Sequence, residues 1–313
     1  MRKISVIGSL NMDLIFQTER VPLAGETIAG NRFKLVPGGK GANQAVAAAR
    51  AGIKTQMYGC VGSDSFGASL LSSLKEAGVD TSNIDTSDKS STGVAAILLE
   101  NSGENRIIII PGCNDLVDKD YVNNHWQEIA MSDLIVLQHE IPMGTTQHII
   151  EAAYEASIPV LLNPAPFYPI PDEVLRKVNY LVLNETELQG LIGNNNCSVE
   201  DLIKASKALL EKGVKKLIIT LGKEGSVFLS NNIVIRQPAF SVKAIDTTAA
   251  GDTFVGYLAT AIINGQDAKE ALEIASAAAA IAVTKIGAQS SIPAIDETLD
   301  LVRKSRDSIS NLD

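Results

Sequence analysis

The sequence predicts an α/β fold: a mostly parallel central sheet flanked by helices, with a small discontinuous β-sheet lid. Three observations support this prediction. Short apolar runs typical of buried strands alternate with helical patterns along most of the chain. Two segments, 14–36 and 92–111, break that alternation. The 313 residues, 45% hydrophobic and 20% charged, are enough to bury a large core.

The expected strands and helices follow one another in regular order. Apolar runs predict strands at 4–8, 55–60, 134–137, 159–162, 180–183, 216–220 and 233–242. Helical spacing of apolar residues predicts helices at 42–51, 65–77, 145–156 and 254–263, and a tightly packed helix near 271–283. Because helices separate most of the strands, parallel pairing through crossover helices is expected.

The two irregular segments are expected to form one small sheet. Segment 14–36 has strand-like pieces without a long helix, and segment 92–111 has the pattern of a hairpin around Asn101-Ser102-Gly103-Glu104. Both lie close in sequence to the polar motifs described below, which favours a β-lid over an active cleft. No repeat or Pro/Gly/Ser-rich linker marks a second folding unit, so residues 1–313 are expected to form a single domain.

Charge and composition exclude several classes of partner. A formal net charge of −9 and a pI near 5.0, without a long basic run, argue against nucleic-acid binding. Three widely spaced cysteines, Cys60, Cys113 and Cys197, indicate reduced thiols, and the N-terminal sequence lacks a secretory pattern, so a cytoplasmic location is expected. The 271–283 helix falls short of a membrane span of roughly 20 residues.

Residues Asp246 to Phe254, DTTAAGDTF, carry the strongest chemical signal. They lie between a strand-like run and a helix, where the first backbone N–H groups lack intrahelical partners and can hold a phosphate. The small residues Ala249, Ala250 and Gly251 would let a γ-phosphoryl group approach these amides, with Asp252 beside it as proton acceptor. Simple helix capping is the alternative explanation of the same residues.

Polar residues at the expected sheet edge form a second group. Asn11 and Asp13 follow the first strand, and Glu140 follows the strand at 134–137. A glycine-rich turn, PGGKGANQ at 37–44, opens an Ala-rich helix and can approach a polyol closely. These side chains can bind sugar hydroxyls at the strand ends. An Asx turn for Asn11 and Asp13, and surface exposure for Glu140, remain alternatives.

Two further motifs suit a nucleotide and its metal. Asn184 and Glu187 open a helix after the strand at 180–183 and could serve Mg²⁺ near phosphates, although the motif alone favours a structural capping box. The turn from Thr220 through Gly222 to Gly225 could hold nucleotide phosphates or ribose, or be an ordinary β-turn. Complete Rossmann and P-loop fingerprints are missing, and the histidines have neither metal-ligand nor triad spacing.

Taken in order, these motifs resemble the ribokinase-like carbohydrate kinase family over nearly the entire chain. The resemblance rests on NMD at 11–13, GGKGANQ at 38–44, Asn184-x-x-Glu187, TLG at 220–222 and DTTAAGDTF at 246–254. It implies ATP-dependent phosphorylation of D-ribose at the 5-hydroxyl. It also implies a homodimer, and the apolar lid edge at 107–110 could pair with a second copy.

The resemblance assigns roles residue by residue. It implies a sugar site of Asn11, Asp13, Gly39, Lys40, Asn43 and Glu140, with Asp252 as base and the turn Ala249, Ala250, Gly251 and Asp252 as anion hole. It implies a Mg²⁺–phosphate network at Asn184 and Glu187, and nucleotide contacts at Thr220, Gly222, Gly225, Gly251 and Ser276. It further implies a monovalent cation, K⁺, near Asp246, Thr248, Ala282, Lys285, Gly287 and Ser291.

Other functions stay open at this stage. A kinase for another pentose, ketose or nucleoside would carry the same motifs, because small changes redirect a hydroxyl-binding pocket. A non-catalytic sugar or nucleotide sensor could keep the fold, although Gly251 and Asp252 disfavour it. A nicotinamide-dependent oxidoreductase matches only the α/β rhythm and lacks the glycine fingerprint.

Overall fold

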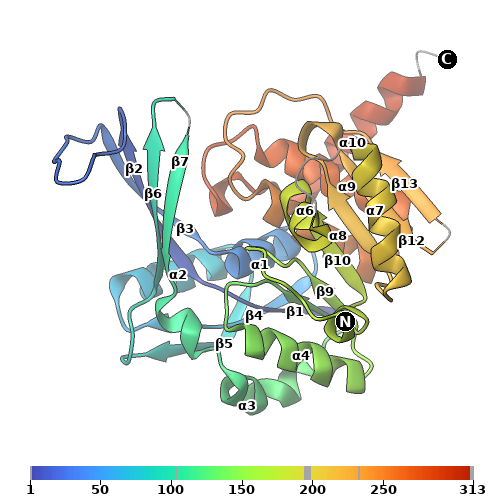
Figure 1. Ribbon diagram of the computed structural model, residues 1–313, viewed down its shortest axis with the longest axis horizontal. Coiled ribbons are helices and arrows are strands. Elements are labelled where there is room, and N and C mark those ends of the chain that lie inside the picture. Colours follow the sequence, from blue (N-terminus) through green and yellow to red (C-terminus); the bar gives the residue numbers. More distant parts are fainter. Residues whose placement is uncertain (1, 103, 194–198, 232, 311–313) are drawn as a thin grey trace.

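The computed structural model describes residues 2–102, 104–193, 199–231 and 233–310, arranged around two sheets (Figure 1). The central sheet has nine strands in the order β13-β12-β11-β10-β9-β8-β1-β4-β5. Their bounds are β1 Lys3–Ile7, β4 Lys54–Gly62, β5 Asp80–Ser87, β8 Leu134–Leu137, β9 Val160–Leu162, β10 Tyr180–Asn184, β11 Leu217–Thr220, β12 Ser226–Ser230 and β13 Ile233–Gln237. Pairing is parallel from β5 to β11, and β12 and β13 add antiparallel strands. The predicted, mostly parallel sheet is confirmed.

Helices cover both faces of this sheet. One face packs against α1 Lys40–Arg50, α2 Ser65–Glu76, α8 Ala250–Ile263, α9 Ala268–Ala282 and α10 Ile295–Ser310. The other packs against α3 Lys119–Ile129, α4 Met143–Glu155, α5 Asp172–Leu175, α6 Glu185–Ile192 and α7 Val199–Glu211. Successive side chains of a strand point to opposite faces of the sheet, so each helix layer packs on its own hydrophobic core. In β8, Leu134 and Val136 face the first layer of helices, whereas Ile135 and Leu137 face the second. Within the described ranges, no helix is long and apolar enough to cross a bilayer.

The second, small sheet stands beside the central one (Figure 1) and has the order β3-β2-β6-β7. Its strands are β2 Asn11–Thr18, β3 Arg32–Gly38, β6 Gly93–Glu100 and β7 Asn105–Ile110. Pairing is antiparallel except between β2 and β6. The predicted separate sheet and its β6–β7 hairpin are confirmed, and Gly103 of the hairpin turn lies outside the described residues.

Three local expectations need correction. Asn11 and Asp13 lie inside β2, where they pair with β3 and β6, so this pairing replaces the alternative Asx turn and the small sheet begins before residue 14. It also extends to Gly38. The strand expected at 233–242 ends at Gln237, because Pro238 has no N–H to continue the ladder.

Of the cysteines, Cys60 and Cys113 are free and buried, and Cys197 lies outside the described residues.

The topology brings the polar motifs to one edge. The strand order changes direction at β1, whose neighbours are β4 on one side and β8 on the other. Open α/β sheets bind ligands at such a switch point, outside the carboxyl ends of their strands. Polar residues stand at these carboxyl ends. Gln138 follows β8 and Asn163 follows β9, while Asn184 and Thr220 are the last residues of β10 and β11.

Candidate active site

The start of α8 is built as the sequence indicates. Ala249 takes the left-handed conformation, with φ 58°, and Ala250 opens the helix. Thr253 completes the turn, since both its N–H and its Oγ1 donate to the carbonyl of Ala249, each at 2.8 Å. Asp252 lies in the first helical turn with only 8% of its surface exposed. The N-terminal turn of α8 therefore carries a buried carboxylate next to its first backbone N–H groups.

Two amides of α1 hold this carboxylate. Asn43 Nδ2 donates to Asp252 Oδ2, and Gln44 Nε2 donates to Asp252 Oδ1, both at 2.9 Å. These bonds connect the glycine-rich motif to the DTTAAGDTF motif across more than 200 residues of sequence. Asn43 is a predicted site residue, whereas the sequence assigns no role to Gln44. The position of Gln44 next to Asn43, within the same motif, is the only sequence feature that indicates its involvement.

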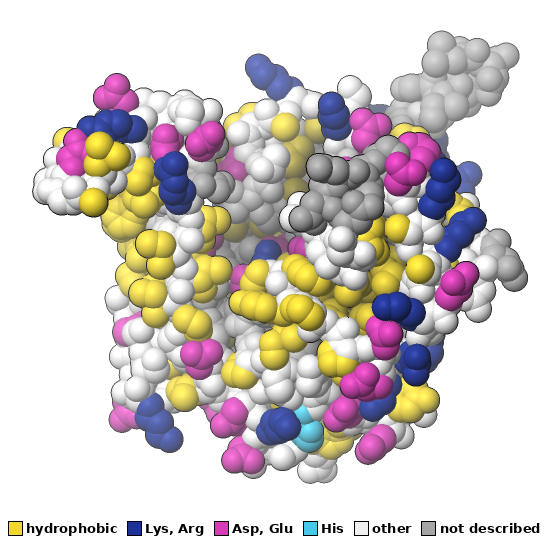
Figure 2. Space-filling model, viewed as in Figure 1, with side chains coloured by type: hydrophobic (Ala, Val, Ile, Leu, Met, Phe, Trp, Pro, Cys, Tyr) yellow, Lys and Arg dark blue, Asp and Glu magenta, His cyan; other side chains and the backbone are white. Residues whose placement is uncertain are grey.

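A cluster of charged side chains lies next to Asp252, around Lys40. Glu140 Oε2 accepts hydrogen bonds from Ser9 Oγ at 2.5 Å and from the backbone N–H of Lys40 at 3.1 Å. Glu140 is half-buried, so the alternative of a freely exposed side chain does not hold. Asp13 packs over Gly38, where an added Cβ would lie 2.4 Å from Asp13 Oδ2. In Figure 2, charged side chains are visible on the floor of a hollow beside the small sheet.

Burial and charge shift the pKa values of this cluster. Burial, together with the neighbouring carboxylates Glu140 and Asp252, raises the pKa of Asp13 to about 7. Burial alone would lower the pKa of the Lys40 ammonium, but the surrounding carboxylates, led by Asp252 and Glu140, raise it overall. The cluster therefore keeps Lys40 cationic and lets Asp13 exchange a proton near neutral pH. Polyol hydroxyls can bind to such a mixture of donors and acceptors.

Asn11 is fixed by a residue that the sequence did not point to. Asn114 Nδ2 donates to Asn11 Oδ1 at 2.7 Å, and Asn114 Oδ1 accepts from the N–H of Leu10 at 2.9 Å. Both asparagines are buried. Gly93 makes room for this pair, since its added Cβ would lie 2.3 Å from both side chains. No local motif around Asn114 suggested this contact.

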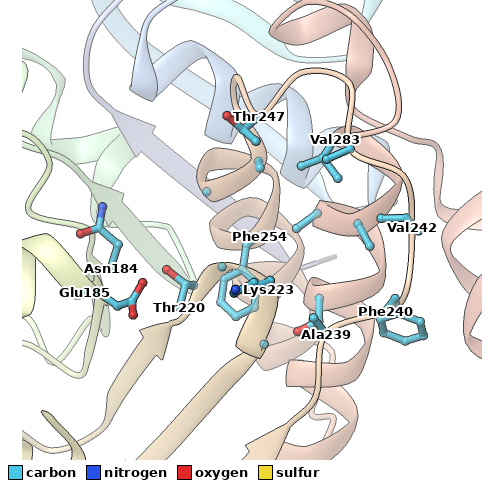
Figure 3. A pocket seen from close by; sticks show the side chains of 18 of the residues that line it. Asn184, Glu185, Thr220, Lys223, Ala239, Phe240, Val242, Thr247, Phe254 and Val283 are labelled. Carbon is cyan, nitrogen blue, oxygen red and sulfur yellow. The ribbon is translucent and has the colours of Figure 1, made fainter. Parts of the chain in front are cut away.

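A cavity of about 860 Å³ lies on the other side of the α8 start (Figure 3). Such a volume fits a nucleotide-sized ligand. Asn184, Glu185 and Thr220 line one side, and Phe240, Val242 and Val283 line the other (Figure 3). Its lining also contains the predicted nucleotide residues Gly222, Gly225, Gly251 and Ser276, together with Ala250. The sequence missed the wall from 239 to 244, because that segment was expected to be partly strand.

The predicted metal–phosphate pair forms a capping box. Glu187 N donates to Asn184 Oδ1 at 2.8 Å, while Glu187 Oε2 and Oε1 accept from Asn184 N and Nδ2. Asn184 lines the cavity, and Glu187 is buried behind it with a pKa that burial raises. Among the described residues no group of three His, Cys, Asp or Glu is placed to hold a metal ion. A Mg²⁺ ion here would take most of its ligands from phosphate and water.

Part of the predicted monovalent-cation group comes together around Asp246. Its Oδ1 accepts from Thr248 N and Oγ1 at 2.9 and 2.6 Å, and its Oδ2 accepts from Gly287 N at 2.9 Å. These bonds lower the pKa of Asp246 against the opposing effect of burial. The Lys285 ammonium points elsewhere, to Glu297 at 2.8 Å, so only its backbone is suited to a cation. Ala282 ends α9, and the Ser291 hydroxyl donates to Ala288 O.

A buried carboxylate at a helix N-terminus, between a nucleotide-sized cavity and a cluster of charged side chains, is the arrangement expected of a small-molecule kinase of the α/β class. Comparison with known families identifies the family of kinases more closely. The model of the pfkB family of carbohydrate kinases matches residues 1–295, and the chain belongs to this family.

Individual relatives are consistent with membership of this family of carbohydrate kinases. The chain is 42% identical to a ribokinase of Schizosaccharomyces pombe, covering 95% of this chain and 96% of the relative. It is 37% identical to a deoxyribokinase of Salmonella typhimurium, covering 94% and 96%. A solved structure of an Arabidopsis thaliana ribokinase complexed with ribose and ATP superimposes with a TM-score of 0.88 at 32% identity, covering 96% of this chain and 98% of the other.

Proposed function

We propose that this protein transfers the γ-phosphoryl group of ATP to the 5-hydroxyl of D-ribose, giving ribose 5-phosphate and ADP. The observation that carries the proposal is the position of Asp252, buried at the α8 N-terminus between the cavity and the Lys40 cluster. Support also comes from the relatives, which include ribokinases at about 40% identity over nearly their whole length.

The proposed mechanism uses few residues. Asn11, Asp13, Gly39, Lys40, Asn43 and Glu140 bind the sugar, and Asp252 accepts the proton of the attacking hydroxyl. Backbone amides of Ala249, Ala250, Gly251 and Asp252 stabilise the charge that develops on the transferred group. Lys40 is suited to the same task, because the carboxylates around it keep it protonated. The nucleotide occupies the cavity along Thr220, Gly222, Gly225 and Ser276.

Two cations complete the proposal. Mg²⁺ would be held near Asn184 and Glu187, and would neutralise phosphate charge when bound with ATP. K⁺ would lie near Asp246, Thr248, Ala282, Lys285, Gly287 and Ser291, where carboxylate, hydroxyl and carbonyl oxygens are available. Such a cation would brace the α8 start, since Thr248 is one residue from the left-handed Ala249.

Domain organisation and assembly also belong to the proposal. We propose a single kinase domain in which the small sheet closes as a lid over the sugar, excluding water during transfer. A homodimer formed through that sheet is supported by the exposed isoleucines of β7, Ile107 to Ile110, which are 45–60% exposed. We also propose a cytoplasmic location, supported by the free thiols of Cys60 and Cys113.

A kinase for 2-deoxyribose is the second candidate, favoured by the deoxyribokinase relative at 37% identity. Both sugars carry the same 5-hydroxyl, so the Asp252 chemistry is common to them. They differ in one hydroxyl, and a site built to hydrogen-bond that hydroxyl rejects the analogue without it.

The deciding experiment measures ADP production with Mg²⁺–ATP and K⁺. D-ribose, 2-deoxyribose, fructose, adenosine and a no-sugar control are compared, and Asp252→Asn is run in parallel. Ribose-dependent turnover that the variant loses is expected. Turnover with only another substrate would move the specificity, and nucleotide binding without any turnover would leave a sensor rather than an enzyme.

A further inference from the structure

The Asp252 carboxylate is connected to a chain of buried amides. Gln44 Nε2, which donates to Asp252 Oδ1 at 2.9 Å, also lies 3.1 Å from Asn163 Oδ1. On its other side, Gln44 Oε1 accepts from Gln138 Nε2 at 2.7 Å. Gln44 and Gln138 are 0% exposed and Asn163 is 9% exposed. The three amides come from α1 and from the carboxyl ends of β8 and β9, and the last two reach Asp252 through Gln44.

The chemistry of the groups fixes the direction of every bond in this chain. An ionised carboxylate only accepts, so the Gln44 NH₂ group must turn towards Asp252 and its Oε1 must turn away. That oxygen in turn requires the NH₂ group of Gln138. Asn163 Nδ2 donates to the Val182 carbonyl at 3.0 Å, which turns its Oδ1 towards Gln44. Each amide therefore has one orientation that satisfies its partners.

Close glycine contacts restrict two members of this network, Gln138 and Gln44. An added Cβ at Gly8 would lie 2.0 Å from Gln138 Oε1, and one at Gly256 would lie 2.7 Å from the Gln44 carbonyl. Gln138 Oε1 accepts no hydrogen bond from the described residues. A buried acceptor without a partner costs free energy, but an apolar side chain at this position would leave Gln44 Oε1 without its donor instead. The amide of Gln138 is therefore tied to the orientation of Gln44.

We propose that Gln44, held by Gln138 and Asn163, is a positioning residue that sets the rotation of the Asp252 carboxylate for phosphoryl transfer. Asn43 and Gln44 each take one lone pair of one oxygen, which fixes the carboxylate plane and leaves the remaining lone pairs for the sugar hydroxyl. This inference rests on the proposed function, because it gives Asp252 the role of base.

The test begins with Gln44→Met and Gln138→Met, which keep volume and remove the amide. Gln56→Met is the matched control, since Gln56 is a buried glutamine of β4 bonded to Tyr58 and Lys3 instead of this network. We expect Gln44→Met to lower kcat about 10- to 100-fold, with the KM for ATP within about twofold. Gln138→Met should lower kcat by a smaller factor, and Gln56→Met should keep wild-type kcat.

A double-mutant cycle separates positioning from a structural role. If Gln44 acts through Asp252, Gln44→Met should cause no further loss of kcat in an Asp252→Ala background. Wild-type kcat in a folded Gln44→Met variant, or a full additional loss in the Asp252→Ala background, would overturn the proposal. If Gln44→Met does not fold, the same cycle is run with Gln138→Met and judged by the same criteria.

The two proposals fail in different ways. A wild-type protein that phosphorylates no sugar refutes the proposed function. An active wild type with an undiminished Gln44→Met variant refutes only the positioning role. If the wild type prefers another sugar, the cycle is measured with that sugar.

Discussion

At the scale of single residues, the site depends on carboxylates whose surroundings differ. Asp252 accepts two amide hydrogen bonds at a helix N-terminus, whereas Asp13 packs over Gly38 in a half-buried cluster with Glu140 and Lys40. Neighbouring carboxylates can take separate tasks when their environments differ in this way. Asp252 is suited to accept a proton, and Asp13 to hold the sugar.

Replacing Asp252 by Asn should reduce turnover without abolishing nucleotide binding. General-base assistance typically contributes about 10²–10⁴-fold, equivalent to roughly 3–5 kcal/mol, so kcat should fall by that factor. The cavity lining is unchanged by the substitution, so the dissociation constant of ATP should stay within about threefold. Steady-state kinetics and calorimetric ATP titration check both parts, and near-normal turnover would rule out Asp252 as the base.

The pKa of Asp13, about 7, predicts a pH dependence of sugar binding. The ionised carboxylate accepts hydrogen bonds at every lone pair, so the KM for ribose should fall as the pH rises from 6 to 8. The same pKa shift has the opposite effect on the stability of the fold, which decreases as the pH rises. The folded state keeps a proton that the unfolded chain loses above pH about 4, so this group lowers the free energy of unfolding as pH rises towards 7.

Asp13→Asn supplies the comparison for that prediction. The amide does not titrate, so the variant should bind ribose more weakly and lose this part of the pH dependence of KM. Kinetics at constant ionic strength between pH 6 and 8 measure it. Identical pH profiles for the wild type and the variant would show that another group governs sugar binding.

At the scale of elements, the site depends on how closely α8 approaches α1. Gly256 lies one turn after Asp252 and faces α1, where an added Cβ would lie 2.4 Å from Ala47 Cβ and 2.7 Å from the Ala48 nitrogen. Backbone atoms cannot move aside cheaply, so only glycine allows this approach. The two helices then bring Asn43 and Gln44 within hydrogen-bond distance of Asp252.

Gly256→Ala should therefore damage both stability and turnover. Overpacking typically costs about 1–3 kcal/mol, and displacement of α8 should lower kcat at least about tenfold. Gly144→Ala is the control. Gly144 lies in α4, and an added Cβ there would make only an ordinary contact, 3.7 Å from Lys119 Cε of α3. Thermal unfolding and kcat are measured for both variants. Equal behaviour of the two would show that close helix packing does not position the base.

At the scale of the whole molecule, the small sheet combines a polar inner end with an apolar edge strand. Asn11 and Asp13 of β2 belong to the candidate sugar site, while β7 exposes Ile107 to Ile110, and hydrophobic side chains are visible on the small sheet in Figure 2. An edge strand of this kind is prone to pair with another chain. The same sheet can therefore serve closure over the sugar and association of two copies.

Ile108→Lys combined with Ile110→Lys should shift the protein from dimer to monomer. Both side chains are more than half exposed in the single chain, so the substitutions leave the core intact but introduce charge into a shared surface. Ile233→Lys on the edge strand β13, 51% exposed, is the matched control. Sedimentation velocity measures the mass. A wild type that is already monomeric, or a double variant that stays dimeric, contradicts the proposed assembly.

The sequence by itself determined the α/β class, most of the parallel strands, the small sheet and the two motifs that meet at Asp252. Local patterns carry this information, because the period of apolar residues and the small residues at a helix start reflect nearby backbone geometry. The sequence also predicted nucleotide-binding roles for Asn184, Thr220, Gly222 and Ser276, and all four line the cavity.

Only the tertiary structure decided which distant side chains complete the site. Gln138, Asn163 and Asn114 carry no local signal of their role, since their partners lie on other strands and helices. The segment 239–244 became a cavity wall because Pro238 ends β13. Hydrogen bonds and burial between residues far apart in sequence depend on how strands order and helices pack, and no local pattern specifies those distances.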